Sequence, residues 1–221
     1  MTNANQNTPR NLVIGSEGFV GQPLCTFLEE AGEEVVRFDV KRGEHEDARS
    51  VDLPLEEVDR VYFLAWDVGG AKYLYREDAQ FRQLRWNLQL MWNVFPQLRE
   101  TEMPFLFVSS QLAEEVDTVY GVTKRLGEVW TALIDTGAYL RLGNVYGGYE
   151  PRNERSHVVA DFVHQALEDG KIEMMTTGEE VRQFVHIDDV CRAFRRAATE
   201  QLQGVHDVSS FEWTSIRHLA E

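Results

Sequence analysis

The chain has 221 residues, with 37 acidic residues against 22 lysines and arginines and a formal net charge of −15. This length suits one domain with at most a small appended lobe, and the acidity argues against nucleic-acid binding, which needs clustered basic residues. No apolar run approaches the length of a membrane span, and residues 1–10, which we expect to form a flexible tail, lack the apolar core of a signal peptide. We therefore expect no membrane partner and a cytoplasmic location.

Strand-like and helical patterns alternate along most of the chain. We expect strands at 11–14, 34–39, 60–65, 104–109 and 138–143 and helices at 18–31, 79–99 and 118–136. Pro96 should kink or shorten the second of these helices. The alternation predicts an α/β fold, a Rossmann-like doubly wound parallel sheet with helices on both faces. We assign this domain to 11–148 and expect a small, shortened C-terminal substrate lobe with returning elements over 149–221.

A glycine triplet joins the first predicted strand to the first predicted helix. Gly15 permits a tight turn, Gly18 lets the backbone approach phosphate oxygens, and Gly21 lets the helix pack on the strand. The free amides and the positive end of the helix dipole then face a pyrophosphate. An ordinary glycine-rich turn is the alternative, because a glycine triplet alone is a weak signal.

A carboxylate at the end of the next strand supports a dinucleotide site. Asp39 is placed to accept hydrogen bonds from the adenosine ribose and to repel the extra phosphate of NADP, so we expect NAD as the cofactor. Lys41 and Arg42 follow directly and leave a ribose phosphate as an alternative, although basic loop residues are more often solvated.

A tyrosine and a lysine four residues apart start a later helix, so Tyr120 and Lys124 share one helical face. A nearby ammonium, helped by the positive nicotinamide ring, should lower the pKa of the phenol, which is then able to exchange a proton with a substrate hydroxyl. Ser110 ends an apolar strand at the carboxyl edge of the sheet, where open α/β folds bind their ligands. The alternatives are a surface helix pair and an ordinary cap serine.

Taken in order, these motifs resemble the extended short-chain dehydrogenase/reductases, specifically the NAD-dependent nucleotide-sugar epimerases and dehydratases. The resemblance implies a catalytic triad of Ser110, Tyr120 and Lys124, with Lys124 also binding the nicotinamide ribose. It implies a nucleotide-sugar substrate, held by Asn87, Ser110, Asn144 and Arg182. It also implies that NAD contacts lie in the glycine-rich loop, at Asp39, in the adenine-contacting segment, at the end of the third strand and around the catalytic helix: Gly15, Glu17, Gly18, Phe19, Val20, Asp39, Asp52, Leu53, Leu64, Ala65, Tyr120, Lys124 and Leu142.

The residues after Ser110 bear on the reaction type. Dehydratases of the family carry an acidic pair there, whereas this chain has Gln111 and Leu112. Glu114 and Glu115 are more readily interpreted as a solvated loop. The resemblance therefore favours a 4-epimerase using a transient keto sugar, with an NAD(P)-dependent sugar reductase or a dehydratase as the alternative. A non-catalytic, cofactor-binding regulatory protein is the alternative from another class.

Several residues are expected to be structural. His186 and the pair Asp188 and Asp189 are interpreted as a strand end and helix cap, with no metal site, and Cys25 and Cys191 as buried apolar residues. A homodimer through the helices at 79–99 and 118–136 would cover an apolar set on the first of them: Phe81, Leu84, Leu88, Met91, Val94 and Phe95. The alternative is that this face packs on its own sheet.

Overall fold

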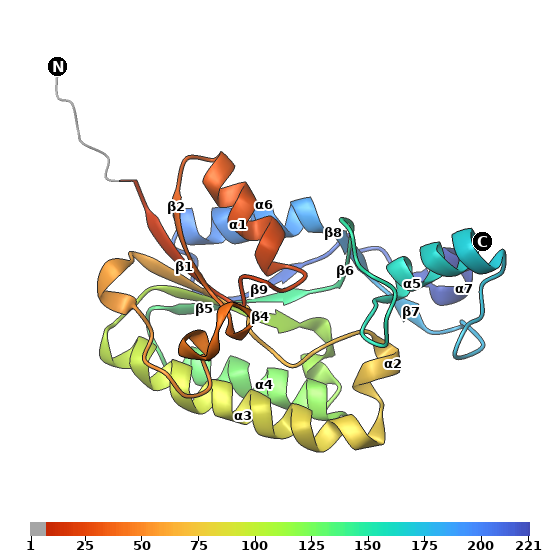
Figure 1. Ribbon diagram of the computed structural model, residues 1–221, viewed down its shortest axis with the longest axis horizontal. Coiled ribbons are helices and arrows are strands. Elements are labelled where there is room, and N and C mark those ends of the chain that lie inside the picture. The colour runs from red at the N-terminus through yellow and green to blue at the C-terminus, as the bar shows by residue number, and fades with distance from the viewer. Residues whose placement is uncertain (1–7) are drawn as a thin grey trace.

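The computed structural model describes residues 8–221, and a six-stranded parallel sheet forms its centre (Figure 1). The strand order is β2-β1-β3-β4-β5-β9. The strands are β1 (Arg10–Ile14), β2 (Glu34–Phe38), β3 (Arg60–Phe63), β4 (Phe105–Ser110), β5 (Gly137–Leu142) and β9 (Gly204–Val208). The order reverses between β1 and β3, and ligands of open α/β sheets bind at such a switch point.

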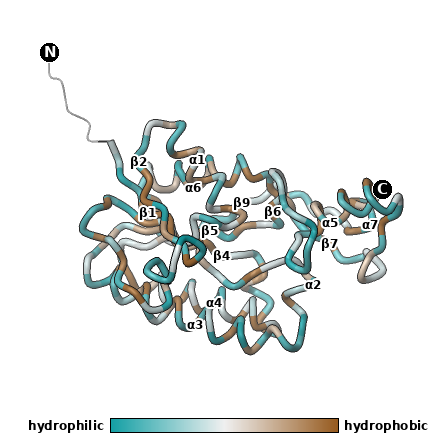
Figure 2. The backbone as a smooth tube through the Cα atoms, viewed as in Figure 1, coloured by the Kyte–Doolittle hydropathy of each residue, from teal (hydrophilic) through white to brown (hydrophobic). Residues whose placement is uncertain are grey.

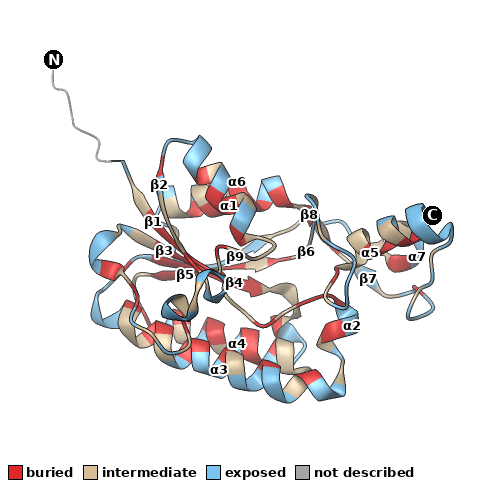
Figure 3. Ribbon diagram, viewed as in Figure 1, coloured by how far each residue is buried: buried red, intermediate tan, exposed pale blue. Residues whose placement is uncertain are grey.

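Two helical layers cover the sheet, as the sequence predicted. In Figure 1, α1 (Gly21–Glu30) and α6 (Ile187–Thr199) lie above it, while α3 (Glu77–Glu100) and α4 (Val119–Ala132) lie below. Alternate strand residues supply the two cores: Phe105 and Phe107 pack toward α3, and Leu106 and Val108 toward α1 and α6. Buried residues accordingly concentrate in the strands and on the inner helix faces (Figure 3).

Both cysteines lie in the upper core and are free and buried, as expected. Burial raises the pKa of Cys25 to about 11 and that of Cys191 to about 12, so both stay protonated thiols at neutral pH.

Two expectations need correction. Helix α3 continues through Pro96 to Glu100 instead of being shortened there, because Phe95 and Leu98 are fully buried against the sheet and hold both sides of the proline in place. The sixth strand, β9, was not predicted; its sequence is partly exposed at the sheet edge and lacks a continuous apolar run. Of the expected tail, residues 1–7 lie outside the described part, and Arg10 already pairs with Glu34 in the sheet.

The remaining elements gather at one end of the sheet. They comprise α2 (Ala71–Leu74), α5 (Val158–His164) with a π-helical turn (Gln165–Asp169), α7 (Ile216–Ala220) and two small sheets, β6 (Asn144–Tyr146) with β8 (Phe184–His186) and β7 (Val181–Arg182) with β10 (Thr214–Ser215). This lobe carries fewer apolar segments than the sheet (Figure 2). Along the chain, α6 and β9 lie between segments of this lobe, but they pack in the main layers. His186 caps α6 by accepting a hydrogen bond from the Asp188 amide, as predicted.

Candidate active site

The glycine-rich loop leaves β1 at the strand-order reversal and is packed too tightly for side chains. Gly15 has φ +92°, and a Cβ there would lie 2.6 Å from the Ala65 nitrogen. A Cβ on Gly21 would lie 2.0 Å from the Gly15 oxygen, so the start of α1 presses directly on the turn. Only glycine fits these positions. The result is a tight, half-buried turn that leads into a helix start, which fits a pyrophosphate.

Asp39 is tied to this loop from the next strand. Its carboxylate accepts hydrogen bonds from the Glu17 amide at 3.0 Å and from the Lys41 amide at 2.9 Å. The Lys41 ammonium donates to the Glu17 carbonyl at 2.8 Å. Asp39 therefore stands beside the glycine-rich loop, as a ribose-binding carboxylate requires, and the Lys41 ammonium already has a partner.

A compact turn brings Ser110 and Tyr120 together although only nine residues separate them in the chain. After β4, the 3-10 turn at Gln111–Glu114 packs on the first turn of α4, where a Cβ on Gly121 would lie 2.1 Å from the Glu115 oxygen. Thr118 caps α4 by accepting a hydrogen bond from the Gly121 amide at 3.0 Å. This contact places the Tyr120 phenol beside the Ser110 hydroxyl, near enough for the serine to lower the pKa of the phenol.

Lys124 lies one helical turn further along α4 and is 2% exposed. Its ammonium donates to the Val108 carbonyl at 2.7 Å and lies 5.8 Å from the centre of the Tyr120 ring. Burial lowers the pKa of Lys124 well below its usual value, and the negative charge of Glu128 opposes this only in part.

The acidified phenol expected beside a bound nicotinamide is not present in the protein without its ligands. Burial raises the pKa of Tyr120 to about 12, and the hydrogen bond from Ser110 lowers it only partly. The ammonium of Lys124 is turned to the strand carbonyl, and it is itself disfavoured by burial, so it does not stabilise a phenolate. Tyr120 is a neutral phenol at pH 7, set to donate a proton.

Trp66 lies in the site but was not among the predicted site residues. Its ring lies under the Lys124 ammonium, 4.3 Å from nitrogen to ring centre, and packs on Phe63 and Phe107. A cation over an indole face is attracted by the ring quadrupole. The available signal was an aromatic residue directly after the apolar end of the third strand, at the carboxyl edge of the sheet.

A buried carboxylate behind the site was also missed. Glu128 is 1% exposed; it accepts from the Ser109 hydroxyl at 2.6 Å and from two nitrogens of Arg141 at 2.7 and 2.8 Å. Arg125 donates to it at 2.8 Å. Although burial raises the pKa of Glu128, these three donors together lower it below its usual value. The carboxylate thus joins α4, β4 and β5 directly beneath the catalytic residues.

The predicted substrate residues are dispersed. Asn87 is fully buried in α3, where its amide oxygen accepts from the Asp67 amide at 2.8 Å and supports the loop after β3. Asn144 and Arg182 lie at the junction with the lobe, and the backbone N–H of Asn144 donates to the Gln183 carbonyl at 2.7 Å. Gln183 in turn accepts from Gln111 at 2.6 Å, which links the turn after Ser110 to the lobe.

The predicted cofactor contacts away from the loop differ in exposure. Leu53, Leu64 and Leu142 are buried in the two cores, and Asp52 is exposed. The Leu53 amide donates to the Gln97 side chain at 2.8 Å, which fixes this segment along α3.

A strap from the lobe covers the glycine-rich loop. His157 stacks on Phe19 with 5.1 Å between ring centres, and Arg155 donates to the buried Asp67 carboxylate at 2.9 Å. Gly70 is in contact with the same strap, since a Cβ there would lie 2.0 Å from the Ser156 oxygen. The lobe is therefore anchored over the candidate cofactor site from two sides.

The model of the NAD dependent epimerase/dehydratase family matches residues 11–209, which include the glycine-rich loop, Asp39 and all three catalytic candidates. The chain belongs to this family. NAD is the cofactor that the family uses, and the glycine cradle with Asp39 fits it.

Two curated proteins with sequences similar to this chain are reductases. One is a UDP-2-acetamido-2,6-beta-L-arabino-hexul-4-ose reductase from Pseudomonas aeruginosa, 31% identical over 201 residues that cover 86% of this chain and 50% of the relative. The other is a dTDP-4-dehydro-6-deoxy-D-allose reductase from Streptomyces bikiniensis, 32% identical over 112 residues, covering 47% of this chain and 34% of the relative. The chain thus spans half the length of the first relative and about a third of the second.

Solved structures of the family share the fold. An NAD-dependent NDP-hexosamine 5,6-dehydratase of tunicamycin biosynthesis superposes with a TM-score of 0.81 at 20% identity, covering 95% of this chain and 78% of the other. The Thermus thermophilus UDP-glucose 4-epimerase, solved with NAD, gives a TM-score of 0.79 at 22% identity, with coverages of 96% and 81%. Within residues 8–221, no helix combines the length and apolar character needed to cross a bilayer.

Proposed function

We propose that this family member is an NAD-dependent enzyme that moves hydride at a sugar carbon of a nucleotide sugar. The observation that supports this best is the grouping of Ser110, Tyr120 and Lys124 at the carboxyl edge of the sheet, where β4 ends. A regulatory protein that only bound NAD could use Lys124 to hold the ribose, but it would have no need of the neighbouring hydroxyls of Ser110 and Tyr120.

Each of the three residues has a role in proton handling. Ser110 holds the reacting oxygen of the sugar by a hydrogen bond, and Tyr120 gives its proton to that oxygen or recovers it. Lys124, freed from the Val108 carbonyl, binds the nicotinamide ribose and adds positive charge beside the phenol. When bound, NAD supplies the hydride acceptor or donor.

Two reactions fit this machinery, and both need no further acid or base. The first is 4-epimerisation through a transient keto sugar, as in the superposed UDP-glucose 4-epimerase. The second is net reduction of a keto sugar, supported by the two curated relatives, which are reductases. Dehydration is disfavoured because Gln111 follows Ser110 and is paired with Gln183.

The lobe over 149–221 is proposed to bind the substrate. An arginine fork suits diphosphate oxygens, and the half-buried Arg182 of β7 carries one at the lobe. Asn144 lies on β6, which pairs with β8 in the other small sheet, at the point where the chain leaves the main sheet. A cytoplasmic location suits such a soluble sugar-nucleotide substrate.

Tyr120→Phe tests the proposal. We expect the variant to bind NAD with unchanged affinity in a calorimetric titration but to lose at least about 100-fold in turnover of UDP- and dTDP-linked hexoses or 4-keto hexoses, in line with the loss of a general acid. Net consumption of NADH identifies a reductase, and turnover without net change in nicotinamide absorbance identifies an epimerase. Full turnover by Tyr120→Phe would refute the proposed mechanism.

A homodimer through α3 and α4 is part of the proposal. Phe81 and Trp92 on α3 are 78% and 75% exposed, and Leu133 just beyond α4 is 74% exposed. Leu84, Leu88, Val122 and Val129 extend this apolar face. The other half of the expected set packs inward: Met91, Val94 and Phe95 are buried in the protein's own core, because they face the sheet.

A further inference from the structure

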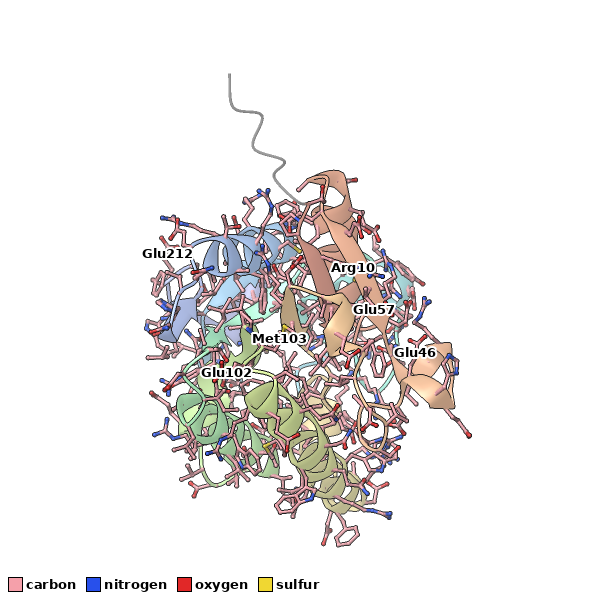
Figure 4. The ribbon with its side chains drawn as sticks, turned by 90° about the vertical axis from the view of Figure 1, so that its left-hand side faces the viewer. Arg10, Glu46, Glu57, Glu102, Met103 and Glu212 are labelled. Carbon is pink, nitrogen blue, oxygen red and sulfur yellow. The ribbon has the colours of Figure 1, made fainter. Side chains whose placement is uncertain are left out.

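The carboxylate of Glu46 occupies an unusual position beside Asp39. It accepts a hydrogen bond from the Asp39 amide at 3.0 Å and another from the Arg42 guanidinium at 3.1 Å. Its side chain is only 15% exposed, although it lies on a short turn at the margin of the molecule (Figure 4). In an ordinary surface ion pair the carboxylate would contact only the arginine. The Glu46 carboxylate also accepts a hydrogen bond from a backbone amide at the end of the strand.

A second carboxylate approaches the same arginine from the glycine-rich loop. Glu17 lies 3.6 Å from the Arg42 guanidinium, and its backbone carbonyl accepts from the Lys41 ammonium. The two cations after Asp39 are thus engaged by acidic or carbonyl oxygens, and three carboxylates, from Glu17, Asp39 and Glu46, surround them. In the protein without ligand, Lys41 and Arg42 therefore both have partners, and neither is free to bind an added anion.

The donors that Glu46 occupies are those that a ribose 2′-phosphate needs. A backbone amide and a guanidinium next to the ribose-binding carboxylate are suited to an anion with several acceptor oxygens. We propose that Glu46 is a specificity-determining residue: its carboxylate acts as an internal substitute for the 2′-phosphate, and it excludes NADP by occupying the donors and by repulsion. The inference rests on the proposed dinucleotide site and deepens it.

Under this mechanism, NADP is excluded by the turn that carries Glu46 as well as by Asp39. Removing the charge of Glu46 leaves Arg42 opposed only by the more distant Glu17 carboxylate. Arg42 is then available to form a charge-assisted hydrogen bond to a phosphate. We expect NADP affinity to increase at least about tenfold, which corresponds to about 1.4 kcal/mol.

The test is a calorimetric titration of the whole chain with NAD and with NADP at low ionic strength, where exposed charges are least screened. Wild type should bind NAD and bind NADP much more weakly. Glu46→Gln should bind NADP at least about tenfold more tightly than wild type does, with NAD affinity changed less than about threefold. Glu44→Gln is the matched control, because it removes one charge from the exposed neighbouring position in the same turn and should change neither affinity.

Two further variants make the outcome decisive. Adding Arg42→Ala to Glu46→Gln should abolish the gain in NADP affinity, since the guanidinium is the proposed phosphate partner. Glu46→Ala should show the same gain, because it frees both the Arg42 guanidinium and the Asp39 amide. Unchanged NADP binding in both Glu46 variants, with NAD still bound, overturns this inference alone. Wild type that binds NADP as tightly as NAD overturns it too, and wild type that binds neither dinucleotide refutes the proposed function together with it.

Discussion

Glu128→Ala is expected to destabilise the fold more than any exposed charge does. The side chain of Glu128 is 1% exposed and that of its main partner Arg141 is 14% exposed, so the substitution leaves a largely buried guanidinium without its carboxylate. Removing one partner of a buried pair costs about 3–5 kcal/mol. Arg141 keeps Glu114, and Arg125 is half exposed and regains water, which places the expected loss at the lower end, about 3 kcal/mol.

Thermal unfolding followed by tryptophan fluorescence measures this loss. For a chain of this size, each kcal/mol corresponds to roughly 2–4 °C, so Tm should fall by about 6–12 °C. Glu114→Ala is the matched control: it removes the other carboxylate on Arg141, but this one is 73% exposed, and the cost should stay below about 1 kcal/mol. Equal effects of the two variants would refute the reasoning, because burial would then not decide the energy of the pair.

The pH dependence of the stability difference between wild type and Glu128→Ala provides a second check. The folded pKa of Glu128 is lowered, so the unfolded chain takes up the proton first as pH falls. The stabilisation is therefore fully present above the ordinary glutamate pKa of about 4.3 and is lost as pH falls through the lowered value. The Tm gap between wild type and Glu128→Ala should be constant from neutral pH down to about pH 5 and should narrow at lower pH.

Three other outcomes follow from the site and the helical face. Lys124→Met should raise Tm at neutral pH while impairing turnover. Because burial lowers the folded pKa of this lysine, the gain in Tm should shrink as pH rises toward 10. A gain in Tm that does not vary with pH would contradict the burial argument. Gly121→Ala should lower both stability and turnover, since its Cβ would lie 2.1 Å from a carbonyl oxygen of the preceding turn; full activity at wild-type Tm would show that this turn does not position Tyr120. Trp92→Glu should convert the dimer to a monomer in sedimentation experiments, with exposed Val116→Glu as the control outside the α3 and α4 face; a wild-type chain that sediments as a monomer at all concentrations would disprove the dimer.

The sequence by itself determined the main architecture and the position of the site. The continuous apolar run of strands such as Phe105–Ser110 and the glycine triplet are local signals, because a buried parallel strand or a tight turn is specified by neighbouring residues. The same holds for His186 as a helix cap. The edge strand β9 carries a weak local pattern and was not recognised.

Only the tertiary structure decided how the chemical groups are paired. The pKa values of Tyr120 and Lys124 depend on burial by segments distant in the chain, and motif spacing contains no information on desolvation. Likewise, Glu128 meets Arg141, and Glu46 meets the Asp39 amide, through folding of separate elements. A sequence specifies which groups are available near a site, but a charge is stabilised or disfavoured by what surrounds it in space.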